Sequence, residues 1–149
     1  MKNIITILVL VMSTTAFAQR GGKMAERIKA QKVAFITEKL SLTPEEAQGF
    51  WPIYNAFENS VERIKSEELR PIKVEIRKGD ISEMRAKELL ETLTAAETKM
   101  HQLKIDLAKD LEKAISPLKI IKLKAAEDEF NRKLLERLKE FRDKRNRRD

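Results

Sequence analysis

Apolar residues recur every three or four positions along most of the chain, the spacing that places them on one face of an α-helix. The repeats fall into segments that begin near residues 23, 44, 80 and 117. The first segment covers residues 23 to about 40, and the third segment extends to about residue 115. The pattern therefore predicts an all-α chain of four amphipathic helices.

The start of the second segment carries a strong helix-start signal. Thr43 can cap the helix, Pro44 fits the first helical position, and Glu46 can complete a capping box with Thr43. Farther along, Pro71 removes an N–H group from the helix interior, so we expect a kink or break between Leu69 and Ile72.

Two further boundaries separate the later segments. Residues 78–80 (Lys-Gly-Asp) form the clearest turn of the chain, and either Asp80 or Ser82 can cap the helix that follows. Ser116 followed by Pro117 again offers a cap and a first helical residue.

The third segment has apolar positions that alternate spacings of four and three, as in a heptad seam. They are Leu89, Leu93, Ala96, Met100, Leu103, Leu107, Leu111 and Ala114. A seam of this length needs an antiparallel partner, so we expect an elongated antiparallel hairpin of four helices. Such a thin layer cannot bury every apolar stripe, and we expect a homodimer or an exposed apolar groove.

Composition narrows the possible functions. The 149 residues include no Cys and one His, so no disulfide, thiolate metal site, cysteine nucleophile or multi-histidine zinc site can form within one chain. The sequence shows no nucleotide-binding glycine loop and no catalytic constellation, and we expect neither an enzyme nor a cofactor.

The first eighteen residues have the layout of a secretory signal peptide. A basic start precedes an almost wholly apolar run over residues 4–12, and Ala16-Phe17-Ala18 supplies small residues before a cleavage site. Nine apolar residues are too few for a membrane anchor, which needs about 20. We expect cleavage after Ala18, export to the periplasm, a single helical domain over residues 19–138 and a basic tail over 139–149 that frays.

The net charge of +7 takes its meaning from this location. In the cytosol, basic helices would suggest nucleic acid, but an exported chain meets lipid head groups or acidic stretches of other proteins. We therefore expect no nucleic-acid partner, and the basic tail is a candidate contact with an anionic membrane surface.

Candidate partner-binding residues lie on the second segment. Its apolar stripe consists of Phe50, Ile53, Tyr54, Phe57, Val61 and Ile64. Trp51 lies beside this stripe and is a candidate partner-facing aromatic residue. Arg63, Lys65, Arg70, Lys73 and Arg77 are candidates for a basic binding surface. They alternate with glutamates, so a solvated face with i,i+4 ion pairs is the competing interpretation.

A metal site has weak support. Glu97 and His101 are one helical turn apart and could supply two ligands. Two ligands make an incomplete site, and a solvated histidine is the simpler interpretation.

Residues 42–48 (LTPEEAQ) resemble the LTxxQ motif of the Spy/CpxP family of periplasmic chaperones and stress regulators. The motif residues are Leu42, Thr43, Pro44, Glu46 and Gln48, for which a structural capping role is expected. The longer string over residues 40–58 resembles a Bacteroidetes-type branch labelled as sensors of ECF-type sigma factors.

The resemblance implies an ATP-independent holdase, a dimer of antiparallel hairpins that binds unfolded or membrane-associated proteins on an apolar and basic face. Two alternatives stay open: a stress sensor that regulates an extracytoplasmic sigma factor, and a metal-binding periplasmic sensor. Nucleic-acid binding would require that the chain is not exported.

Overall fold

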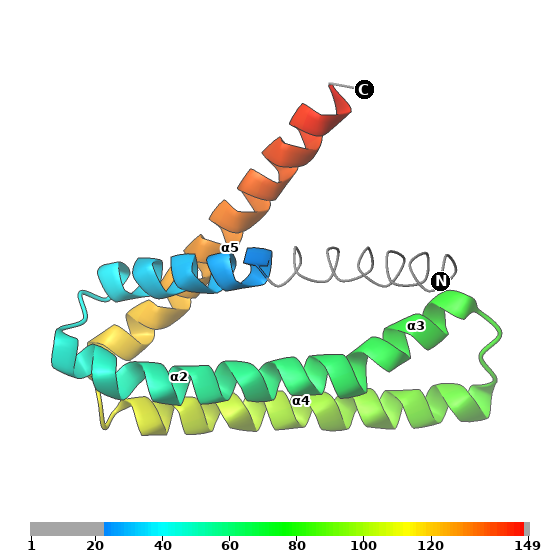
Figure 1. Ribbon diagram of the computed structural model, residues 1–149. Coiled ribbons are helices and arrows are strands. Elements are labelled where there is room, and N and C mark those ends of the chain that lie inside the picture. Colours follow the sequence, from blue (N-terminus) through cyan, green and yellow to red (C-terminus); the bar gives the residue numbers. More distant parts are fainter. Residues whose placement is uncertain (1–22, 148–149) are drawn as a thin grey trace, which may run out of the picture. The chain divides into compact units, whose positions relative to one another are not determined.

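The computed structural model describes residues 23–147, and every regular element in this range is a helix (Figure 1). The all-α prediction is confirmed. Residues 23–39 are helical and are followed by α2 (Pro44–Ile64), the π-helical turn η1 (Lys65–Leu69), α3 (Arg70–Lys78), α4 (Glu83–Leu111) and α5 (Pro117–Asn146). The predicted signal peptide lies outside the described residues.

The chain forms two compact units. One consists of residues 42–121, and the other of the described residues on either side, 23–41 and 122–147. No helix of the described part is long and apolar enough to cross a bilayer.

Short-range capping begins α2 and α4. The Glu46 N–H donates to Thr43 Oγ1 (3.2 Å) and the Thr43 N–H donates to Glu46 Oε2 (2.9 Å), which confirms the capping box. Ser82, rather than Asp80, caps α4 by accepting from the Arg85 N–H. Asp80 instead adopts a left-handed conformation with Gly79 in the turn, at φ 62° and 72°.

We expected a kink or break between Leu69 and Ile72, and the helical pitch changes at the edge of this range, where Figure 1 shows the axis bending as α3 begins. The helix continues through Pro71, and the irregularity is the π turn η1, which lies before the proline and is closed by the Arg70 N–H donating to the Lys65 carbonyl. A proline ring clashes with the carbonyl four residues earlier, so its effect falls on the preceding turn.

The π turn also keeps the apolar stripe in register. Ile64 and Ile72 are both buried although eight residues separate them, a spacing that would rotate Ile72 by about 80° in a regular α-helix. One additional residue in the turn removes most of this rotation. The buried faces of α2 and α3 therefore point the same way, toward α4.

Within residues 42–121, α2, η1 and α3 run antiparallel to α4 (Figure 1). Contacts between the two sides show this direction, because residues later in the first side meet residues earlier in α4. Gly49 lies against Ala114, Glu68 pairs with Lys99, and Glu75 pairs with Arg85. A Cβ atom on Gly49 would lie 3.0 Å from the Ala114 Cβ, so glycine permits the close approach of the two helices.

The seam of α4 is buried at three of its positions, Leu89, Ala96 and Leu111, whereas Leu93, Met100 and Leu103 are half-buried. In the other unit, the buried side chains are Ile36, Leu40, Leu123, Ala126 and Phe130. The α5 helix continues to Asn146, past residue 138, after which we expected a frayed tail.

Candidate functional site

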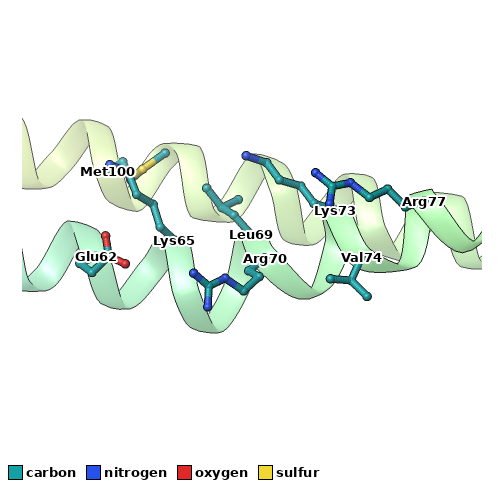
Figure 2. Close-up of a pocket in the computed structure, with 8 residues that line it drawn as sticks. All are labelled: Glu62, Lys65, Leu69, Arg70, Lys73, Val74, Arg77 and Met100. Carbon is teal, nitrogen blue, oxygen red and sulfur yellow. The ribbon is translucent and has the colours of Figure 1, made fainter. Parts of the chain in front are cut away.

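A groove of about 530 Å³ runs along η1 and α3 and forms the candidate site (Figure 2). Four cationic side chains line it: Lys65, Arg70, Lys73 and Arg77. Leu69, Val74 and, from α4, Met100 supply the apolar part of the lining, and Glu62 is its carboxylate. We call this surface the basic groove.

The cations of the basic groove have no partner among the described residues. Lys65, Arg70, Lys73 and Arg77 form neither an ion pair nor a side-chain hydrogen bond there, and the same holds for Glu62. Four positive groups therefore face one carboxylate, and the groove attracts anions.

The groove stays cationic because neighbouring glutamates turn toward α4. Lys99 Nζ donates to both Glu68 carboxylate oxygens at 3.0 Å, and the Arg85 guanidinium binds Glu75 in a bidentate pair at 2.7 and 3.0 Å. The Arg85 guanidinium holds the pKa of Glu75 below its usual range, so this carboxylate stays charged and bound.

This pairing bears on the i,i+4 interpretation of the alternating charges on α3. Arg70, Lys73 and Arg77 are spaced by three and four and share one side of the helix, while Glu75 lies on the side toward Arg85. Glu75 makes its ion pair between helices rather than within one. The i,i+4 interpretation therefore does not hold for Glu75.

The structure brings together four of the candidate binding residues, Lys65, Arg70, Lys73 and Arg77. Lys65 and Arg70 line the same groove because the π turn accommodates their spacing of five. Arg63, also predicted, is exposed on α2 and does not line the groove.

Trp51 lies edge-on to two rings of its own helix. Its ring centroid is 4.9 Å from that of Phe50 and 5.7 Å from that of Tyr54, and both contacts are T-shaped. Phe50 and Tyr54 are buried, whereas Trp51 is half-buried and keeps one part of its ring at the surface.

A second concavity of about 210 Å³ lies between α3 and the start of α4. Its lining is wholly apolar and consists of Ile72, Ile76, Ile81, Ala86, Leu89, Leu90 and Leu93. Ile76 and Leu90 are 57% and 61% exposed, so this apolar pocket opens to solvent. It was not identified in the sequence, where Leu90 stands outside the predicted seam.

Three residues of the LTxxQ-like motif, Thr43, Pro44 and Glu46, form the start of α2. Glu46 caps α2 and also accepts from Lys119 Nζ at the start of α5 (2.5 Å), and this hydrogen bond together with the Thr43 N–H lowers the pKa of Glu46. Pro44 is the first residue of α2, and Leu42 is half-buried. Gln48 is exposed and makes no hydrogen bond with a described residue.

The weak metal candidates, Glu97 and His101, are both exposed on α4. Within residues 23–147, no cluster of three carboxylate or imidazole side chains could hold a metal ion. Neither residue lines the basic groove or the apolar pocket.

The comparisons with known proteins add no assignment: no family model, curated protein or solved structure matches the chain.

Proposed function

We propose that the protein is an exported, non-enzymatic chaperone-like protein that binds unfolded or partner polypeptides on residues 42–121. The observation that carries the proposal is the adjacency on α3 of a solvent-open apolar pocket and an unneutralised basic groove. Ile72 and Ile76 belong to the first surface, and Lys73 and Arg77 to the second.

The two surfaces supply the two contributions that such binding needs. Exposed apolar side chains such as Ile76 and Leu90 give affinity for the apolar segments that an unfolded polypeptide presents. The groove cations attract acidic segments over a longer range and raise the rate of capture. Neither contribution requires a nucleotide or a chemical step.

The finer architecture belongs to the same proposal. A dimer of antiparallel hairpins, as in the Spy/CpxP family that residues 42–48 resemble, would place two such surfaces in one assembly. The predicted signal peptide supports a periplasmic location, where no ATP supply is expected to assist release.

The proposal is tested by aggregation of a chemically denatured client protein after dilution into the full chain. We expect suppression at near-stoichiometric ratios, weakened but not abolished when ionic strength rises from about 0.05 M to 0.5 M, because salt screens the groove and leaves the apolar pocket intact. No suppression at a large molar excess, with helicity intact by circular dichroism, would contradict the proposal.

A further inference from the structure

The second half of α5 has an apolar stripe that the described part of its unit does not cover. Leu134, Leu138 and Phe141 are spaced by four and three, so they lie on one face of the helix. Exposure rises along this face from 7% at Phe130 to 49% at Leu138 and 69% at Phe141, and Leu135 beside it is 66% exposed.

The exposure of the stripe rises because the helix of residues 23–39 contacts only the earlier part of α5. The helix of residues 23–39 contacts α5 through the Phe35 and Phe130 rings (centroids 5.7 Å apart) and through Lys39 and Glu129. Farther along α5, the Arg137 guanidinium donates to Gln31 Oε1 at 3.3 Å. Beyond it, α5 continues to Asn146 with its stripe exposed.

Charges around the stripe are segregated. At about 100° per residue, the carboxylates of Glu136, Glu140 and Asp143 fall on the side of the helix opposite the stripe. Arg137, Arg142 and Lys144 flank the stripe, and Arg145 continues its line. The stripe is thus bordered by positive charge, and the negative charge is turned away.

We propose that residues 134–147 of α5 lie in the interface of a bilayer that contains anionic phospholipids. Leu138 and Phe141 face the acyl chains, next to the half-buried Leu134, and the flanking guanidinium and ammonium groups reach the phosphates on both sides of the helix. An apolar stripe with Lys and Arg at its borders is the composition of helices that lie in this plane.

Two features favour a bilayer over a second copy of the chain. The stripe offers only three apolar heptad positions before Arg145 takes the next place in line, which is too short a seam for a stable coiled coil. Identical cationic borders would also repel each other across a twofold axis, whereas phosphates attract them. The inference stands on α5 alone and does not depend on polypeptide binding.

Co-sedimentation with vesicles tests this inference. We expect the full chain to bind vesicles of phosphatidylglycerol and phosphatidylcholine at least tenfold more tightly than vesicles of phosphatidylcholine alone, and to lose this preference at high salt. The measurement is repeated with the chain that begins at Gln19, so that the apolar residues 4–12 do not contribute.

Paired substitutions assign the binding to residues 134–147. Phe141→Gln is expected to weaken vesicle binding about tenfold, while Ile121→Gln, at a similarly exposed position of the same helix (73%), leaves it unchanged. Lys144→Gln with Arg145→Gln should weaken it about twentyfold. Lys104→Gln with Lys109→Gln, on the exposed side of α4, is the charge-matched control.

Four results would overturn the inference, of which three are equal binding to neutral and anionic vesicles, equal effects of the paired and control substitutions, and concentration-dependent self-association that Phe141→Gln abolishes. The third would assign the stripe to a second copy of the chain. Competition by a soluble acidic polypeptide at physiological salt, without vesicle binding, would likewise assign it to a protein partner.

Discussion

At the residue scale, Glu129 joins two helices of its unit. Its carboxylate binds Lys133 and Lys39, each at 2.9 Å, and both ammonium groups also lie over the Phe35 ring, at 4.9 and 5.5 Å from its centroid. The hydrogen bonds from Lys133 and then Lys39 lower the pKa of Glu129 from 4.5 to about 2. One carboxylate therefore links the helix of residues 23–39 to α5.

This lowered pKa predicts a pH dependence of stability. Because the folded state holds Glu129 ionised more strongly than the unfolded state does, its contribution is fully present above pH 4.5 and is lost as pH falls toward 2. Thermal unfolding followed by circular dichroism should show a steeper fall of Tm between these pH values in the wild type than in Glu129→Gln.

Glu136→Gln is the matched control, since Glu136 is exposed on the same helix and pairs with no described residue. This variant should keep the wild-type slope. Equal slopes in all three proteins would show that Glu129 is not linked to folding.

Residue-level features differ in how far the sequence predicts them. The Thr43–Glu46 capping box was predictable because both partners lie within one turn of each other. The pairing of Glu129 with Lys39 was not, because it depends on which helix faces α5. The interhelical pairing of Glu68 and Glu75 escaped prediction for the same reason.

At the element scale, η1 behaves as a one-residue insertion that keeps the apolar stripe facing α4. Pro71 indicated an irregularity of the helix from the sequence. The position of that irregularity depends on the clash of the proline ring with the preceding turn and on the burial of Ile72. Helix types and starts were predicted well, whereas a change of helical pitch has no periodic signature of its own.

Deletion of a single residue tests this role of η1. Removing Glu67, which is exposed, should convert the π turn into an α turn and change the free energy of unfolding by less than about 1 kcal/mol, since Ile64 and Ile72 then stand seven residues apart. Urea unfolding measures the change.

Removal of exposed His101 from the regular helix α4 is the matched control. It rotates Leu111 by about 100° relative to Ala96 and should cost more than about 2 kcal/mol, the value of re-exposing a buried leucine. Similar losses for the two deletions would refute the insertion account.

At the scale of the whole molecule, the described helices leave several large apolar side chains exposed. Ile76 and Leu90 border the apolar pocket, and Leu138 and Phe141 follow the uncovered face of α5. The heptad and helical patterns predicted such a surplus. Its location required the structure, because burial depends on which helix lies opposite each stripe.

The basic groove was likewise predictable from the sequence only in part. The spacing of Arg70, Lys73 and Arg77 identified a basic face from sequence, but its freedom from ion pairs depends on Lys99 and Arg85 of α4, which hold the neighbouring glutamates. Positive charge on the groove is therefore a property of the paired helices rather than of one segment.

The central claim, that the apolar pocket of residues 42–121 binds polypeptides, is tested most directly by the affinity of the full chain for a denatured client. Ile76→Gln with Leu90→Gln should lower this affinity about tenfold or more. Ile121→Gln with Leu118→Gln, an isoleucine and a leucine outside the pocket that are at least as exposed, should leave it unchanged. Equal affinities for the wild type and both variants would contradict the account.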